Sequence, residues 1–237
     1  MAMTRLRYQL SVAAPGGGIA ITGAVVAATL GAAAACWVIA IDQMRGMDMG
    51  VATRLGSFAF FTASWAAMMT AMMLPGAVPA VLRRTQTSGR LLAAPLFAGS
   101  YIATWVIVGI AVYALYRPHG TVVAGVVVIA AGIYEATPIK RHFRLQCHEK
   151  ARTGLLFGLD CVGSSIGLMA ILVVVGVMSV PWMAVIAVVV VAQKLLPAKV
   201  IIDVPLAIAI VGLGIVVLAA PSTVPGLMPP TRHIPMM

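Results

Sequence analysis

The sequence predicts an all-α fold, a polytopic bundle of transmembrane helices, from its composition and from the length of its apolar stretches. Hydrophobic residues make up 62% of the 237 residues and charged residues only 9%, and the mean hydropathy is +1.05. A soluble domain carries about 25% charged residues, so this composition does not suit a water-exposed surface. A bilayer core about 30 Å thick needs roughly 20 apolar residues per helix, and about seven stretches approach that length.

The predicted spans lie in one helical domain over residues 19–220. Residues 1–18 precede it, and residues 221–237 form a tail that contains five prolines. The sixth span is the shortest and opens at Pro181, since proline suits the first turn of a helix. The seven predicted spans are residues 19–41, 57–82, 92–116, 120–138, 157–179, 181–195 and 200–220.

The distribution of lysine and arginine predicts the orientation. One set of alternate connections holds 12 of the 16 basic residues, and the other holds 4. Cytoplasmic loops collect lysine and arginine, so residues 1–18 are expected to be cytoplasmic and the tail 221–237 external. This pattern explains the net charge of +10 without nucleic acid. The expected location is a cell inner (plasma) membrane, which the chain crosses several times, with the lipid bilayer as the surrounding partner.

The first external connection contains Met44, Met47 and Met49 beside two aspartates. A short polar loop has little core for methionine to fill, and thioethers are soft ligands suited to Cu(I). These three residues are therefore candidate metal ligands, although two nearby arginines oppose the capture of a cation.

The second span carries a strip of thioethers, Met68, Met69, Met72 and Met73, followed by Pro75. Residues three and four apart are neighbours on a helix, so the four sulfurs lie close together. Pro75 frees a backbone carbonyl and predicts a kink. Methionine is also a flexible filler of hydrophobic cores, so packing and Cu(I) binding are both open roles for this strip.

Charged residues near span ends are costly in a membrane and are candidates for function. Glu135, Asp160, Lys194 and Asp203 all fall toward the predicted cytoplasmic side. One interpretation is an ion-paired network, with Glu135 or Asp160 bound to Lys194 or Lys199. The alternative is a metal or proton site on the same side, made by Cys161, Cys147 and His148.

The fifth span places small residues and two sulfur atoms on one helical face. Small residues there allow close helix contact, and a soft-ligand site facing the second span would use the same face. The connection before it, residues 139–153, carries Cys147 and His148 and is expected to be a basic cytoplasmic loop. The members of the small-residue face are Gly154, Gly158, Cys161, Ser165, Met169 and Gly176.

These segments resemble a bacterial family of predicted metal-binding integral membrane proteins, a domain of unknown function, from about Trp65 to Pro197. The family's W-x-x-M-x-x-A-M-M-x-P segment is similar to the stretch from Trp65 to Pro75, and its Y-Q-x-x-P-x-K segment to that from Tyr134 to Lys140. The resemblance implies a helical membrane fold and metal ligands at cysteines, of which Cys147 and Cys161 are present. The chain is a variant in which other expected ligand positions hold Phe143, Ser164, Ser165 and Gln193.

Two functions follow as expectations. The first is a copper-handling membrane protein that binds or passes Cu(I) through methionine and cysteine to a membrane metalloenzyme, with copper as the candidate metal. The second is a non-catalytic accessory subunit that packs against a membrane oxidoreductase such as a copper-dependent monooxygenase. No nucleophile with an oriented base is visible, so the chain is not expected to be an enzyme.

Overall fold

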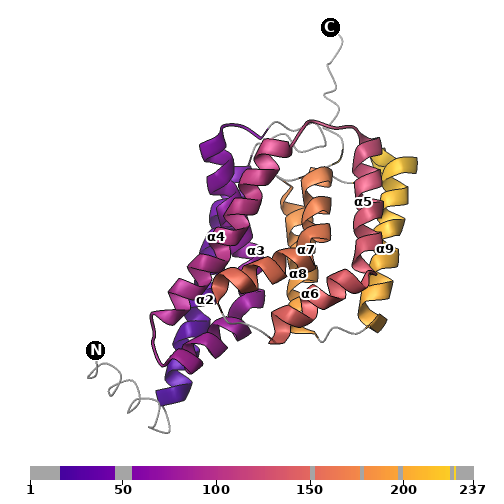
Figure 1. The fold of residues 1–237 in the computed structure, drawn as a ribbon. Helices are drawn as coiled ribbons and strands as arrows, with labels where there is room; N and C mark the ends of the chain where they lie inside the picture. The colour runs from indigo at the N-terminus through magenta and orange to yellow at the C-terminus, as the bar shows by residue number, and fades with distance from the viewer. Residues whose placement is uncertain are drawn as a thin grey trace.

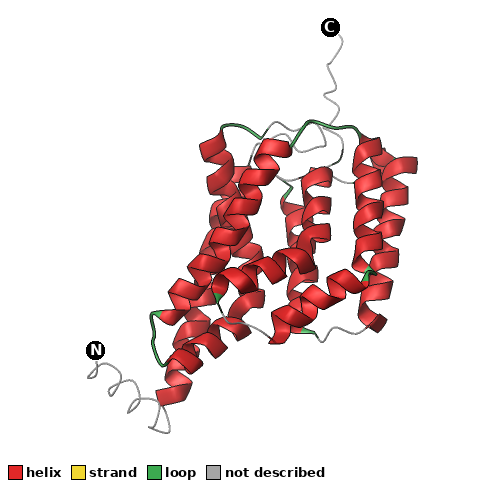
Figure 2. Ribbon diagram, in the orientation of Figure 1, coloured by secondary structure: helices red, strands yellow, loops and turns green. Residues whose placement is uncertain are grey.

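The computed structural model describes residues 17–45, 55–149, 153–176, 179–196, 200–224 and 227. These parts of the chain form α-helices and one short 3₁₀ helix, which confirms the predicted all-α fold (Figure 2). The helices are α2 (Gly17–Met44), α3 (Phe58–Ser88), α4 (Ala93–Leu115), α5 (Thr121–Glu135), α6 (Pro138–Glu149), α7 (Gly154–Gly176), α8 (Val180–Leu195), α9 (Val200–Ala219) and η1 (Pro221–Thr223).

Each of the seven predicted apolar stretches corresponds to a helix. Four of these helices, α2, α3, α4 and α7, are long and apolar enough to cross a membrane by length and composition. A fifth span results if α5 and α6, which meet at a bend of 66°, are counted as one broken span. The apolar helices α8 and α9 are shorter in the part that the structure describes. The number of spans and the side of each terminus stay predictions.

Helix α6 replaces most of the basic loop that was expected over residues 139–153. Its apolar and thiol side chains recur at helical spacing among charged ones, so the segment forms an amphipathic helix rather than an irregular connection. Lys140, Arg144 and Cys147 fall at spacings of four and three residues and are all buried. Leu145 faces outward with 41% of its surface exposed. The buried face of α6 therefore carries two cations and a thiol.

Helix α3 is long because both of its ends are capped and its prolines do not interrupt it. The Ser57 hydroxyl accepts a hydrogen bond from the Phe60 backbone N–H at 3.3 Å, which satisfies one free donor of the first turn. Gly89 follows the last turn with φ of 62°, a conformation that glycine adopts without strain. The helix continues through Pro75 and Pro79.

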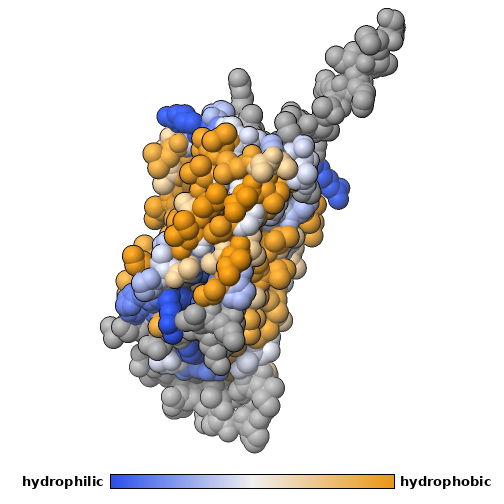
Figure 3. Space-filling model, turned by 90° about the vertical axis from the view of Figure 1, so that its right-hand side faces the viewer, coloured by the Kyte–Doolittle hydropathy of each residue, from blue (hydrophilic) through white to orange (hydrophobic). Residues whose placement is uncertain are grey.

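The helices form a bundle whose centre is made by α3, α4, α7 and α8 (Figure 1). Helix α3 packs against α2, α4 and α8, while α7 packs against α4, α5, α6 and α8. Helix α9 packs mainly on α5, at the opposite edge from α2 (Figure 1). The face made by the α5 and α9 side is covered largely by apolar side chains (Figure 3). That surface suits contact with lipid.

Candidate metal centre

Five helices bring one side chain each to the same buried region of the bundle. Met73 comes from α3, Tyr101 from α4, Cys147 from α6, Cys161 from α7 and Lys194 from α8. We call these five residues the central cluster. Three of them, Met73, Tyr101 and Cys161, have no exposed surface.

Cys161 reaches Tyr101 because α7 and α4 cross closely. Gly154 and Gly158 lie on the α7 face that meets α4, and a side chain at Gly158 would collide with Thr104. This close approach places the Cys161 Sγ 3.1 Å from the Tyr101 hydroxyl oxygen. All six members of the predicted small-residue face of α7 are buried, so the packing role predicted for that face is confirmed.

Lys194 brings a positive charge to the cluster. Its Nζ donates a hydrogen bond to the Tyr101 hydroxyl at 2.7 Å and lies 3.5 Å from the Met73 Sδ. It also sits 5.2 Å from the centre of the Tyr101 ring, within the range of a cation–π contact. Because the Tyr101 oxygen accepts from the ammonium, its own proton can point to the sulfur of Cys161.

Gly76 explains how a lysine side chain fits between α8 and α3. A Cβ at Gly76 would lie 2.5 Å from the Cδ of Lys194, far inside van der Waals contact. The glycine one position after Pro75 therefore leaves the groove along which the lysine stem reaches Met73.

Cys147 closes the cluster from the side of α6. Its Sγ lies 3.9 Å from the Ser164 hydroxyl, and this hydroxyl donates a hydrogen bond to the Cys161 backbone carbonyl at 2.9 Å. Its exposed fraction is 9%, against 0% for Cys161. Of the two thiols, Cys147 is thus the one nearer the surface.

A network of charged residues holds α5, α6, α8 and α9 together beside the cluster. Glu135 forms a buried ion pair with Lys140 and accepts a hydrogen bond from the Gln193 amide at 2.8 Å. Arg144 forms an ion pair with Asp203 and donates to the Gln193 carbonyl at 2.8 Å. Buried charges need such partners because desolvation is costly.

The predicted pairing of Glu135 with Lys194 was wrong, although a charged network was expected. Lys194 takes part in neither of the two salt bridges among the described residues. The cations that pair with Glu135 and Asp203 come from α6, because this helix folds back under the bundle instead of forming a loop. Asp160 is half-buried in α7, and Lys199 lies outside the described residues.

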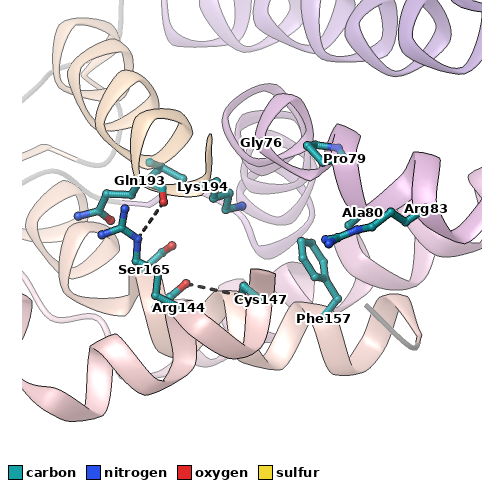
Figure 4. Close-up of a pocket in the computed structure, with 12 residues that line it drawn as sticks. Gly76, Pro79, Ala80, Arg83, Arg144, Cys147, Phe157, Ser165, Gln193 and Lys194 are labelled. Atoms are coloured by element: carbon teal, nitrogen blue, oxygen red, sulfur yellow. Dashed lines mark hydrogen bonds between the residues drawn. The ribbon is translucent and has the colours of Figure 1, made fainter. Parts of the chain in front are cut away.

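A cavity of about 40 Å³ adjoins the cluster (Figure 4). Cys147 and Lys194 line it, together with Ser164, Gln193 and the guanidinium groups of Arg83 and Arg144. Its volume is enough for one or two water molecules. The cavity reaches Cys147, while Cys161 is not among its lining residues.

The thioether strip on α3 is buried, and one member belongs to the cluster. Met68, Met69, Met72 and Met73 are each at most 1% exposed. Only Met73 has a contact with a polar atom among the described interactions. Met68, Met69 and Met72 belong to the hydrophobic core, which fits a packing role, and metal binding by these three stays a prediction.

Two further predicted ligands that the structure describes, Met169 and Met44, lie outside the central cluster. Met169 is buried in α7 but lies two turns from Cys161, about 12 Å along the helix axis. Met44 was expected in an external loop. It is instead the last residue of α2 and packs into the core, because this helix continues through the polar residues Asp42 and Gln43. Met47 and Met49 lie outside the described residues, as does the side chain of His148 in α6.

The expected site between the second and fifth spans is assembled differently from the prediction. Helices α3 and α7 each pack against α4 and α8. Tyr101 contacts Cys161, and Lys194 contacts both Tyr101 and Met73. Tyr101 was not predicted, because a single tyrosine in an apolar span resembles an ordinary core residue. Lys140 and Arg144 were assigned to a solvated loop, but their spacing of four residues, followed by Cys147, was a signal of a helical face.

The donor atoms of the cluster suit one class of metal. Among the described residues there is no group of three or more histidine, cysteine or acidic side chains that could hold a metal ion. Two thiols and one thioether remain, and this soft set is of the kind that selects Cu(I).

A comparison with protein families agrees with this ligand chemistry. The model of the PpoB2 family, described as a copper chaperone, matches residues 62–217. The chain belongs to this family. The match covers every residue of the central cluster, so the region common to the PpoB2 copper chaperone family contains the candidate site. No curated protein and no solved structure matches the chain.

The positions at which the earlier resemblance implied further ligands also lie around the cluster. Ser164 contacts Cys147, and Ser165 and Gln193 line the cavity. The ring of Phe143 packs against Gly163 on α7. Membership of the PpoB2 copper chaperone family supports a copper-related role for the chain.

Proposed function

We propose that this protein is a copper-handling integral membrane protein of a bacterial inner membrane, which binds Cu(I) at the central cluster and passes it to a membrane metalloenzyme. The single observation that carries the proposal is the convergence of Met73, Cys147 and Cys161 from three helices, in a chain that belongs to a copper chaperone family. The protein itself performs no catalysis in this proposal.

The chemistry of the cluster favours a bound Cu(I). A cysteine binds metal as its thiolate, and two thiolates with one Cu(I) carry a net charge of −1. The ammonium of Lys194 balances this charge from beside Met73 and Tyr101. Loss of either thiolate would leave the lysine charge uncompensated.

The order of ligands follows from their depth. The cavity reaches Cys147, which is the more exposed thiol, and Cys161 lies behind it with no exposed surface. Copper therefore meets Cys147 first and is then shared with Cys161 and Met73. The same path in reverse releases the ion to an acceptor.

The proposal is tested by measuring the affinity for Cu(I) under anaerobic conditions, with purified protein competing against a chromophoric Cu(I) chelator. The expected result is one Cu(I) per chain, with weaker binding after Cys147→Ser, Cys161→Ser or Met73→Leu. Met183→Leu is the matched control for Met73, since Met183 is equally buried and lies about 16 Å from Lys194 along α8. Equal affinity in all of these variants and the wild type would refute the copper site.

A second candidate function is supported by the position of Lys194. Its Nζ contacts Met73 and Tyr101, so a basic group already lies where a cation would bind. The protein would then be a non-catalytic accessory subunit of a membrane oxidoreductase, such as a copper-dependent monooxygenase. In that case we expect the protein to be purified in a complex with the oxidoreductase. The Cys161→Ser variant should then assemble with the oxidoreductase and leave the activity of that enzyme unchanged.

A further inference from the structure

A groove at one end of the bundle lies apart from the central cluster. It has a volume of about 360 Å³ and is formed by the last turns of α3, the connection to α4, the first turns of α4 and the start of α7. A volume in this range accommodates a small organic ligand. We propose that this groove binds the head group of an anionic phospholipid.

Two arginines supply the positive side of the groove. Arg84 lies in the last turns of α3 and Arg90 in the connection after it, and both line the groove. Gly89, with φ of 62°, turns the chain between them, so Arg90 is brought back beside the helix that carries Arg84. Neither arginine takes part in a salt bridge of the described chain, and none of the described residues that line the groove is acidic.

Apolar and hydroxyl side chains complete the groove. Leu92 and Leu96 line it with 73% and 72% of their surfaces exposed, and exposure of this extent suits contact with acyl chains. Ser100 and Thr153 add hydroxyl groups. The floor is closed where Gly154 of α7 packs directly on the Phe97 carbonyl of α4.

The position of the groove matches a membrane surface. It lies at the ends of α3, α4 and α7, three of the helices that are long and apolar enough to cross a membrane. Basic pockets between transmembrane helices bind anionic head groups near the bilayer surface. A guanidinium group binds phosphate through two parallel hydrogen bonds, while the leucines contact the chains of the same lipid. A free phosphate would use only the arginines.

The experiment measures the thermal unfolding of the purified full chain in detergent micelles as lipid is added. Dioleoyl phosphatidylglycerol is expected to raise the midpoint in a saturable manner, whereas dioleoyl phosphatidylcholine and the acyl-free glycerophosphoglycerol are expected not to. The double variant Arg84→Gln and Arg90→Gln is expected to weaken the apparent phosphatidylglycerol affinity at least tenfold. Leu92→Ser with Leu96→Ser is expected to weaken it as well.

The control is the double variant Arg45→Gln and Arg117→Gln, which removes the same charge where α2 and α4 end. It is expected to retain the wild-type affinity for phosphatidylglycerol. Equal stabilisation by the two lipids, or equal weakening by both arginine pairs, would overturn the proposal. Stabilisation by glycerophosphoglycerol alone would replace the lipid with a soluble phosphate ester. None of these results depends on copper.

Discussion

The α5–α9 contact and the central cluster both join buried helix faces, but they are built from opposite kinds of residue. At α5–α9, glycines let the two backbones touch. A Cβ at Gly214 would lie 2.9 Å from the backbone nitrogen of Ile129, and one at Gly132 would lie 2.9 Å from that of Val211. In the central cluster, long sulfur-containing and polar side chains fill the space between helices instead.

This difference separates the structural from the functional part of the bundle. A contact made of glycine and backbone offers no sulfur or polar side-chain donor to a ligand, and its role is to hold the helices together. A contact made of thiols, a thioether, a phenol and an ammonium has donor atoms and adjoins a cavity. The charged network of Glu135, Lys140, Arg144 and Asp203 lies between the two regions and fixes α6 against both.

The largest expected effect comes from breaking that network. Glu135→Ala leaves the Lys140 ammonium buried without its carboxylate, and removing one partner of a buried ion pair costs about 3–5 kcal/mol. The free energy of unfolding in detergent micelles should fall by this amount. The double variant Glu135→Ala and Lys140→Met should recover most of the loss, because no charge then stays uncompensated. The exposed Asp42 provides the control, and Asp42→Ala should have almost no effect.

The next effect distinguishes the backbone contact from the binding site. Gly214→Val forces side-chain atoms into the backbone of α5, and overpacking of this kind costs about 1–3 kcal/mol. Gly212→Val is the matched control, since a Cβ at Gly212 meets nothing within 4 Å. The affinity of the folded Gly214 variant for Cu(I) should equal that of the wild type. A change in copper affinity without a change in stability would contradict the division between the two regions.

The sequence was sufficient to predict the fold because hydropathy and span length act locally. All seven predicted stretches are helices, and the packing face of α7 was identified from its small residues alone. Membrane topology depends on the surrounding bilayer and on the charge of loops on both sides, so the span count and orientation stay predictions.

The candidate site was predicted only in part because it depends on distant contacts. Cys147, Cys161 and the strip containing Met73 were identified by their chemistry. These residues are connected through Tyr101 and Lys194, and the contact between Lys194 and Met73 spans 121 positions in the sequence. The periodicity within one segment does not indicate such a contact. The ion-pair partners were missed for a related reason, since the fold of α6 determines which cations reach Glu135 and Asp203.

Replacing the deeper thiol should affect binding more than stability. Cys161→Ser removes a thiolate ligand, and Cu(I) affinity should fall about tenfold or more, roughly 1.4 kcal/mol. Serine is close to cysteine in size and can keep a hydrogen bond with Tyr101, so the free energy of unfolding should change little. Cys36→Ser in α2 is the control, because this half-buried cysteine lies outside the cluster. A loss of folded protein with normal copper binding would assign Cys161 to packing.

The smallest expected effect is a gain of binding at Ser164. Its hydroxyl oxygen lies 3.9 Å from the Cys147 Sγ, so Ser164→Cys would add a third thiol on the cavity side of the cluster. The shorter hydroxyl is replaced by a softer ligand at nearly the same position, and Cu(I) affinity should rise by about fivefold, roughly 1 kcal/mol. Ser64→Cys is the control, because Ser64 is buried in the same core but lies about 13 Å from Met73 along α3. If both variants bind Cu(I) as the wild type does, the side of Cys147 that faces Ser164 and the cavity is not part of the copper path. Cu(I) would then contact Cys147 only on the side away from Ser164.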